Sequence, residues 1–384
     1  MGDVMLNMVK LGDVATYING YAFKPSDWSD QGLPIIRIQD LTGNSYQANR
    51  YKGAYDSKYE IVDGDVLISW SASLGVYIWQ GETALLNQHI FKAVFDKVNV
   101  DKNFFIHQVR TILEKAVSAT HGATMKHLTK PVFDALPFYL PSIEEQRKIT
   151  RKLDEVCALI ELKKQQLKKL DELVKSRFIE LFGDPEYNEK QWAVLKLETL
   201  CSVSSSKRIY QNELSAEGIP FLRISDLVNR MDTGSTECEL YIPEERYEEL
   251  KVSGLVPVAG DMLLTARGTL GRCYTLTASD KFYFQDGMIT WLYGFDKKLT
   301  TNYLTHLFSM SGFRKQIDSL QAGSTVAYLS IAMTKKLDVM LPPIELQNQF
   351  AAFVEQTDKS KLAVQQSLEK LETMKKALMQ QYFR

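Results

Sequence analysis

The sequence has few cysteines, and their spacing does not suggest a shared site. The four thiols include no Cys-x-x-Cys pair, which argues against a disulfide framework and against a zinc knuckle. The five histidines likewise form no His-Glu-x-x-His motif and no close pair of the kind that binds metals. We therefore expect no structural metal.

Long apolar runs and cofactor motifs are also missing. Nowhere do about 18 apolar residues follow one another, and residues 1–10 lack the apolar centre of a signal peptide. There is no Gly-x-Gly-x-x-Gly, no P-loop and no nucleophile elbow. Residues 184–187 read Asp-Pro-Glu-Tyr, which is similar to the Asp-Pro-Pro-Tyr of adenine methyltransferases, but they follow a long helical pattern and we interpret them as a helix stop. These absences predict a cytoplasmic protein with no membrane segment and no catalytic site of its own.

An excess of charge of one sign is absent as well. The net charge of the 384 residues is -1, which excludes a generally basic protein but not a nucleic-acid binder, because binding depends on the local distribution of charge. The chain is too long for one ordinary core, and its apolar fraction of 45% is enough to fill two.

A long helical pattern is present between residues 142 and 183. Its apolar residues recur every three to four positions, which is the a/d spacing of a coiled coil. Ser142 and Glu145 form a Ser-x-x-Glu capping box at the start, and Gly183 suits a left-handed cap at the end. The pattern predicts one amphipathic helix about 60 Å long.

The same pattern returns 201 residues later, from 343 to 383. The entry Leu-Pro-Ser-Ile-Glu-Glu-Gln (140–146) returns as Leu-Pro-Pro-Ile-Glu-Leu-Gln (341–347). Each apolar stripe needs a partner, and we expect the two helices to pair with each other; two independent helices, each lying on its own domain, are the alternative. The residues predicted to form the helix-pair interface are Leu153, Val156, Ile160, Leu167, Leu170, Val354, Val364, Leu368, Leu371 and Leu378.

The stretches before the two helices also match each other. Residues 34–41 match 220–227, 64–75 match 260–271, and the Gly-Ala-Thr at 122–124 matches the Gly-Ser-Thr at 323–325. The first two matches read as strands, and 103–116 as a helix. We predict an α+β protein, a tandem duplication of a mixed α/β domain and a long helix, with the helices packed as an antiparallel coiled coil. The extra residues of the second copy are expected in loops. The predicted boundaries are 1–141, 142–183, 184–341 and 342–384.

The loops that close the matched strands differ between the copies and are the first candidates for a binding surface. The candidates are Ser69, Trp70, Ser71 and Ser73 in copy one and Thr265, Arg267 and Thr269 in copy two. Arg267 can form two hydrogen bonds with guanine O6 and N7, whereas Ser71 can form only one with a base. The alternative is a pair of ordinary hairpins with solvated tips.

A second set of candidates carries charges or hydroxyls suited to phosphate. Arg37 and Arg223 recur on matched strands, where each could hold a phosphate or pair with the Asp three residues later. Matched glycine turns and the loop after a serine run supply the rest: Thr124, Lys126, Thr325, Tyr328, Lys207 and Arg208. Simple helix capping and a solvated loop are the alternatives for these.

In this order and in duplicate, the motifs resemble the specificity subunit of type I restriction-modification systems. They are a Gly-Asp strand with a loop closed by Gly (64–75), a Gly-Ser-Thr turn (323–325), the Leu-Pro-x-Ile-Glu-x-Gln entry, and Leu-Phe-Gly-Asp-Pro (181–185) at the helix end. The resemblance covers essentially the whole chain. It implies a non-catalytic reader of double-stranded DNA, with two target recognition domains that each read one half of a bipartite site.

The resemblance also implies partners. The helix pair would set the spacer between the half-sites and dock two methyltransferase subunits, which carry S-adenosylmethionine. Restriction subunits that use ATP with Mg would join them, and no cofactor would bind this chain. Thr357 and Lys361 interrupt the second stripe, so pairing there needs either a partner subunit or a bridging residue. The alternatives are a coiled-coil scaffold that binds proteins rather than DNA, and a self-contained DNA methyltransferase.

Overall fold

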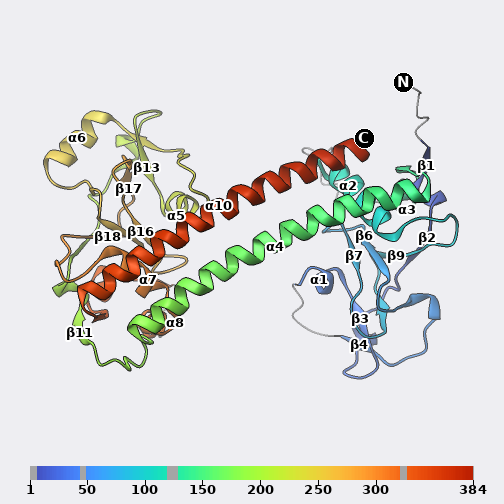
Figure 1. Cartoon of the computed structure of the whole chain (residues 1–384), viewed down its shortest axis with the longest axis horizontal. Helices are drawn as coiled ribbons and strands as arrows, with labels where there is room; N and C mark the ends of the chain where they lie inside the picture. Colours follow the sequence, from blue (N-terminus) through green and yellow to red (C-terminus); the bar gives the residue numbers. More distant parts are fainter. Residues whose placement is uncertain (1–6, 44–48, 119–128, 321–326, 384) are drawn as a thin grey trace. The chain divides into compact units, whose positions relative to one another are not determined.

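The computed structural model describes residues 7–43, 49–118, 129–320 and 327–383. The chain divides into two compact units, Met1–Lys164 with Gln366–Arg384 (unit 1) and Gln165–Gln365 (unit 2). Two long helices, α4 (Ile143–Phe182) and α10 (Ile344–Tyr382), are coloured green and red in Figure 1. Each contributes one part to unit 1 and the other to unit 2.

The ends of α4 follow from its sequence. The Oγ of Ser142 accepts a hydrogen bond from the backbone N–H of Glu145 at 3.3 Å, and so satisfies one of the free N–H groups of the first turn. Gly183 ends the helix at φ 80° and donates its N–H to the carbonyl of Ile179 at 2.7 Å. Glycine reaches this left-handed conformation without strain. The two long helices predicted from the periodicity are confirmed.

Unit 1 contains two four-stranded sheets and one two-stranded sheet. The order β2-β9-β6-β7 is antiparallel throughout, whereas β4-β3-β8-β5 contains one parallel pair, β3 with β8, and β1 pairs with β10. The strands are β1 (Met8–Lys10), β2 (Thr16–Asn19), β3 (Leu33–Ile36), β4 (Arg50–Tyr51), β5 (Glu60–Ile61), β6 (Val66–Ser69), β7 (Gly75–Ile78), β8 (Ala84–Leu86), β9 (Ile90–Val94) and β10 (Pro137–Tyr139). The helices are α1 (Ile38–Leu41), α2 (Lys102–Ser118) and α3 (Lys130–Asp134).

Unit 2 repeats this topology among its described residues, except that its second sheet has three strands and no counterpart of β5. Its sheets are β12-β18-β15-β16, β14-β13-β17 with β13 and β17 parallel, and β11-β19. The strands are β11 (Ala193–Lys196), β12 (Ser202–Ser204), β13 (Ile219–Leu222), β14 (Tyr241–Ile242), β15 (Met262–Thr265), β16 (Cys273–Thr275), β17 (Tyr283–Phe284), β18 (Ile289–Tyr293) and β19 (Asp338–Leu341). The helices are α5 (Ile224–Thr233), α6 (Glu244–Val252), α7 (Thr301–Ser309), α8 (Ser311–Ser319) and α9 (Ile331–Lys335). The predicted tandem α+β duplication is confirmed.

Two local expectations were wrong. The run 34–41 is not one strand, because β3 ends at Ile36 and α1 begins two residues later. The carboxylate of Asp40 accepts from the backbone N–H of Arg37 at 2.7 Å and caps the new helix. The extra residues of the second copy also do not all form loop, since unit 2 has the nine-residue helix α6 between β14 and β15.

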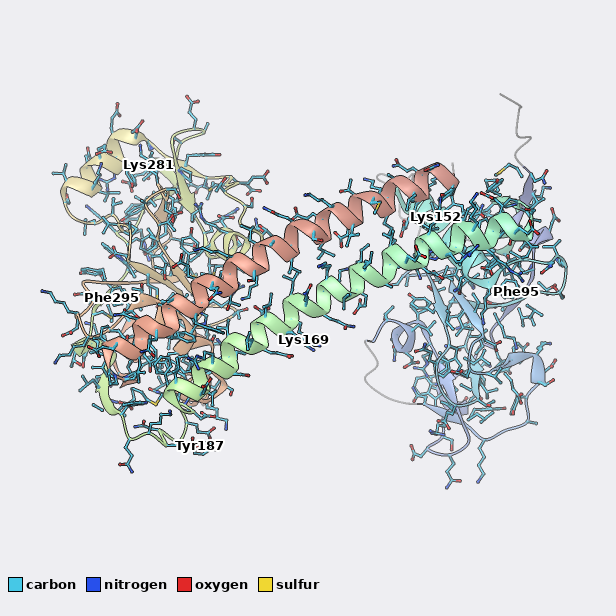
Figure 2. The ribbon with its side chains drawn as sticks, viewed as in Figure 1. Phe95, Lys152, Lys169, Tyr187, Lys281 and Phe295 are labelled. Carbon is cyan, nitrogen blue, oxygen red and sulfur yellow. The ribbon has the colours of Figure 1, made fainter. Side chains whose placement is uncertain are left out.

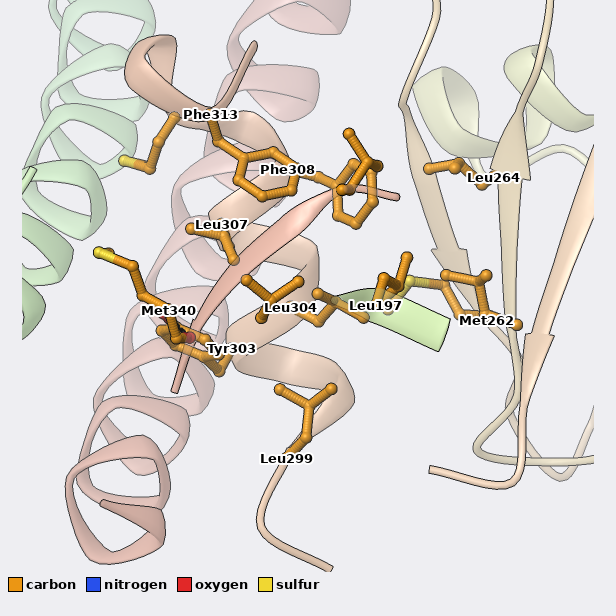
Figure 3. Packing of buried hydrophobic residues seen from close by; sticks show 14 of the residues in the cluster. Leu197, Met262, Leu264, Leu299, Tyr303, Leu304, Leu307, Phe308, Phe313 and Met340 are labelled. Atoms are coloured by element: carbon orange, nitrogen blue, oxygen red, sulfur yellow. Dashed lines mark hydrogen bonds between the residues drawn. The ribbon is translucent and has the colours of Figure 1, made fainter. Parts of the chain in front are cut away.

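The core of unit 2 joins its globular part to both long helices. The ring of Tyr303 stacks on Phe178 of α4 with centroids 5.5 Å apart, and Phe178 meets the edge of Phe350 of α10 at 5.5 Å. The buried O–H of Tyr303 donates to the carbonyl of Met340 at 2.9 Å. Figure 3 shows Tyr303 and Met340 beside the leucines of α7. Aromatic burial at this junction stabilises the helix ends together with the domain.

Unit 1 is joined to the long helices in the same manner. Phe104 of α2 lies edge-on to Phe383, with ring centroids 5.4 Å apart. Leu153 of α4 and Met379 of α10 belong to the same buried cluster. The Nζ of Lys152, labelled in Figure 2, donates to the hydroxyl of Tyr382 at 3.3 Å.

A buried glutamine fixes the start of each long helix. Gln146 accepts from the N–H of Asp101 at 2.8 Å and donates to the carbonyl of Pro141 at 2.8 Å. Gln347 accepts from the N–H of Thr300 at 2.9 Å and donates to the carbonyl of Pro342 at 2.9 Å. Buried amides are stable only when hydrogen-bonded, so the repeated glutamine of the entry motif has a structural role in both copies.

The two long helices lie antiparallel to each other within each unit. In unit 1, Lys164 pairs with Glu372 at 3.6 Å. In unit 2, the Nζ of Lys361 lies 2.7 Å from the carboxylate of Asp171, and this is the bridging contact that the interrupted stripe requires. Of the predicted interface residues, five are buried (Leu153, Val156, Ile160, Val354 and Leu368) and five are half-buried (Leu167, Leu170, Val364, Leu371 and Leu378).

Two general findings apply to residues 7–43, 49–118, 129–320 and 327–383. In these ranges no helix combines the length and the apolar character that a membrane crossing requires. In the same ranges no three His, Cys, Asp or Glu side chains gather as a set of metal ligands.

Candidate nucleic-acid interface

Several loops of unit 1 meet at one edge of its sheets. β2 and β6 end there and β9 begins there, since Asn19 pairs with Phe91 and Ser69 with Ile90. The turn 87–89 from β8 to β9 lies beside the end of β3, because the N–H of Asn87 donates to the carbonyl of Ile36 at 3.1 Å. We call this edge, with residues 19, 37, 70–74 and 87–89, the loop edge of unit 1.

Unit 2 has an equivalent loop edge, formed by residues 204–208, 223, 266–272, 285–288 and 328. The N–H of Gln285 donates to the carbonyl of Leu222, and that of Ala266 to Met288, both at 2.9 Å. Tyr328 joins this edge through an antiparallel bridge with Arg267. The fold therefore brings the candidates Lys207, Arg223, Arg267 and Tyr328 to one side of the unit.

Two of the predicted contact residues are fully buried. The side chain of Ser69 has 0% exposure, and its hydroxyl donates to the carbonyl of Ser73. Thr265, at the matched position, is also 0% exposed; its hydroxyl donates to the carbonyl of Thr269 at 2.5 Å and accepts from the N–H of Arg272 at 3.0 Å. Both hydroxyls hold the loop in shape, and neither reaches the surface.

Replacing Thr265 by valine keeps the volume and removes this loop closure. The N–H of Arg272 would lose its acceptor, and we expect the unfolding free energy to fall by about 1–3 kcal/mol. Hydrogen exchange of the amides at 266–272 measures the effect, and Thr236→Val, at an exposed threonine of the same unit, is the control. Unchanged exchange in Thr265→Val would contradict the loop-closing role.

The tip of unit 1 is held in place by aromatic contacts. The indole N–H of Trp70 donates to the side-chain oxygen of Asn19 at 3.1 Å, and its ring stacks on Phe91 at 5.6 Å and meets the edge of His89 at 4.8 Å. Ser71 is 5% exposed. Ser73 is the predicted contact residue that this tip exposes to solvent.

Arg37 and Arg223 have different partners at their matched positions. Both lie just past the strand end and begin a helix, so their placement on strands was wrong. The guanidinium of Arg37 lies 4.3 Å above the ring of Trp28, and the side-chain oxygen of Asn49, turned towards it, accepts from both Nη atoms. Arg223 instead forms ion pairs with Asp226 at 3.2 Å and with Glu239 at 2.8 Å. Pairing with the Asp three residues later was the alternative to phosphate binding. Hydrogen bonds with Asp226 and Glu239 raise the pKa of Arg223.

The loop edge of unit 2 exposes the predicted cations Lys207 and Arg267. Arg267 is exposed, and its guanidinium lies 5.3 Å from the ring centre of Tyr328. Lys207 and Thr269 are exposed as well, whereas Arg208 pairs with Asp286 at 2.8 Å. The candidates Thr124, Lys126 and Thr325 lie outside the described residues.

The sequence matches a known family over both copies. Residues 4–172 and 189–373 each match the type I restriction modification DNA specificity domain. The chain belongs to this family. Its two specificity domains account for the duplicated loop edges described above.

Curated relatives support the assignment. The chain is 31% identical over 170 residues to the type I restriction enzyme EcoBI specificity subunit of Escherichia coli. The aligned stretch covers 44% of this chain and 35% of that protein. The chain thus spans about a third of the length of that relative. It is 21% identical over 395 residues to the MjaVIII specificity subunit of Methanocaldococcus jannaschii, covering 97% of this chain and 90% of that one.

Solved structures from type I restriction-modification systems share the fold. The S subunit of a type I restriction-modification system from M. genitalium aligns with a TM-score of 0.55 and 14% identity, covering 100% of this chain and 98% of that chain. A chain from a study of complex assembly and conformational transition of the type I R-M system aligns with a TM-score of 0.58 and 16% identity, covering 98% and 97%. At this identity the likeness concerns the fold alone.

The two specificity domains have equivalent frames but different surface chemistry at their loop edges. Sequence reasoning missed Trp28 and Asn49, the partners of Arg37, because they precede and follow it by about ten residues in segments without a motif. It also missed His89, which takes the left-handed backbone conformation at φ 72°. A non-glycine residue there is uncommon, but no sequence pattern announces it.

Proposed function

We propose that this chain is the specificity subunit of a type I restriction-modification complex, in which each specificity domain reads one half of a bipartite DNA site. The observation that carries the proposal is the duplicated loop edge. The same buried hydroxyl closes the loop in both units, at Ser69 and Thr265, while the exposed side chains differ. Two similar frames with different exposed groups suit two different DNA sequences.

The two long helices are proposed to set the spacer between the half-sites and to dock two methyltransferase subunits. A rigid helical connection suits this role because half-sites on one face of DNA lie about 34 Å apart for each helical turn. Exposed apolar side chains on the helices, such as Leu162 and Leu362, at 55% and 60% exposure, support a docking role. The chain itself is proposed to be non-catalytic, with S-adenosylmethionine in the methyltransferase subunits and ATP with Mg in restriction subunits.

The experiment is a methylation map of DNA from cells that carry this chain with its neighbouring methyltransferase gene. Single-molecule sequencing should find a split motif of two short blocks around a fixed gap. Cells that lack this chain but keep the methyltransferase are the control and should lose the motif. An unchanged methylation pattern would contradict the proposal and favour a protein-binding scaffold.

Arg267→Ala tests the second specificity domain. If Arg267 contacts a base, selection at one position of one half-site should relax, at a cost of about 1–3 kcal/mol in discrimination. The other half-site should keep its selection. Binding of variant duplexes by the assembled complex measures this, and Lys251→Ala, an exposed cation on α6, is the control. An equal loss of affinity on all sequences would mean that Arg267 contacts phosphate instead.

A further inference from the structure

An open aromatic cavity lies in unit 1 beside its loop edge. It has a volume of about 440 Å³, and its lining includes five aromatic rings, those of Tyr21, Phe23, Tyr51, Tyr55 and Tyr59. Tyr21 is 45% exposed and Tyr55 40% exposed. Tyrosine combines a large apolar ring with a polar group, and exposed clusters of such rings mark binding sites.

The rings that line the cavity do not stack flat on one another. Tyr21 lies edge-on to Phe23 at a centroid distance of 4.9 Å and tilted against Tyr59 at 5.5 Å. Phe23 meets Tyr51 edge-on at 5.1 Å. The ring of Tyr55, at 40% exposure, offers a surface on which a planar group in the cavity can stack.

Unit 2 closes the equivalent space with its own side chains. The parallel pair Phe221 with Tyr283 in unit 2 corresponds to Ile35 with Leu85 in unit 1. In unit 2 this pair is covered by Tyr247 and Leu250 of α6, which are 6% and 2% exposed. In unit 1 the segment between β4 and β5 forms a short turn, Ser57–Tyr59, in place of that helix. Among the described residues, α6 of unit 2 thus takes the place of the segment that lines the cavity in unit 1.

The cavity adjoins the surface proposed to face DNA. The N–H of Tyr21 donates to the carbonyl of Leu86 at 2.8 Å, and its carbonyl accepts from Gln88 at 2.8 Å. Tyr21 thus lies two residues beyond Asn19, which anchors Trp70 at the tip. A strand of DNA at the loop edge would pass the mouth of the cavity.

We propose that this cavity binds one unstacked nucleobase of the DNA that the first specificity domain contacts. The proposal rests on the proposed function and names a further contact of the same domain. Stacking of a base on an aromatic side chain strengthens binding roughly fivefold to a hundredfold, which is of the same size as the cost of taking one base out of the stack. The gain from stacking on the ring and the cost of leaving the DNA stack nearly cancel, so capture should depend on which base it is and on its neighbours.

The rim of the cavity supplies polar partners for such a base. Lys58 lies 4.9 Å from the ring centre of Tyr59 and pairs with Asp56 at 2.8 Å, so its ammonium group can exchange this exposed partner for a phosphate. The hydroxyl of Tyr55 donates to Glu60 at 2.7 Å, and this hydrogen bond raises the pKa of Tyr55. The carboxylates can accept from the N–H groups on the edge of a base.

The test uses the full-length chain and a seven-nucleotide single strand with 2-aminopurine at its centre. Binding should change the fluorescence of the probe, and Tyr55→Leu, which removes an exposed ring, should weaken binding roughly fivefold to a hundredfold. Ala54→Trp fills the mouth of the cavity and should have the same effect. Tyr210→Leu, at an exposed tyrosine of unit 2 with 62% exposure, is the matched control and should bind as the unaltered chain does.

Equal binding by Tyr55→Leu, Ala54→Trp and the unaltered chain would overturn the proposal. Displacement of the strand by tetramethylammonium ions but not by free nucleosides would also overturn it, because it would assign the cavity to a cation. The test needs no knowledge of the half-site. A chain that binds the strand in this cavity but gives no split methylation motif would refute the proposed function and keep the cavity as a base site, so the two failures can be told apart.

Discussion

Replacement of Phe178 by alanine should lower the unfolding free energy of unit 2 by about 3–5 kcal/mol. The side chain is 0% exposed and contacts the rings of Phe182, Tyr303 and Phe350. Its removal leaves a cavity where α4, α7 and α10 meet, and the surrounding rings belong to three separate helices that cannot all move to fill it. Hydrogen exchange followed on peptides of unit 2 measures the loss.

The next residue along α4 provides the control. Ile179 is 38% exposed, so Ile179→Ala should cost less than about 1 kcal/mol. Met379 of α10 matches Phe178 in the duplication and lies in unit 1. It is 8% exposed, so a flexible side chain fills the corresponding space there. An equal, small effect of Phe178→Ala and Ile179→Ala would mean that the aromatic junction does not stabilise unit 2.

Acid should destabilise unit 2 through His306. Burial of the imidazole lowers the pKa of His306 from 6.5 to about 4. The charge of Asp358 raises this pKa and that of Lys361 lowers it, each by less than burial does. The unfolded chain therefore binds more protons than the folded chain between these values, and stability is lost as the pH falls from 6.5 towards 4. The full shift corresponds to a loss on the order of 3 kcal/mol.

His306→Leu separates this effect from the titration of carboxylates. The variant has no imidazole, so its unit 2 should lose less stability than the unaltered chain between pH 7 and pH 4. The ring of His306 packs edge-on against Phe350 at 5.1 Å, and leucine keeps an apolar contact there. Unit 1 of the same molecule is an internal control, because its acid dependence should not change. Identical acid dependence of unit 2 in both proteins would rule out His306 as its source.

The helical frame was predictable because its signals are local. The periodic stripe, the capping box at Ser142 and the stop at Gly183 lie within the helix or next to it, and the structure places the ends of α4 within one residue of them. The duplicated motifs then fixed the number of domains. The sequence indicated only that a contact was needed near Lys361. It could not identify Asp171 as the partner, because the two residues lie 190 positions apart.

The surface chemistry of the candidate site was less predictable. A serine or threonine at a strand end reads as a solvated hydroxyl, yet Ser69 and Thr265 turn inward to bind the carbonyls of their own loops. The helix α6 was missed because its apolar residues are few and its packing against β13 and β17 decides its conformation. Arg37 and Arg223 have the same motif but different partners, which depend on tertiary contacts.

The two glutamines that begin the long helices have a consequence for the evolution of such chains. Gln146 and Gln347 bind the backbone N–H and carbonyl groups of the preceding domain and the helix entry, at Asp101 and Pro141 in one copy and Thr300 and Pro342 in the other. Every amino acid supplies these carbonyl groups, and every one but proline supplies the N–H. Recombination that replaced one globular domain by a foreign one would therefore keep these hydrogen bonds at the helix entry, and a lineage that acquired a new DNA specificity in this way would have to match anew only the side-chain contacts of the junction, such as that of Tyr303 with Phe178.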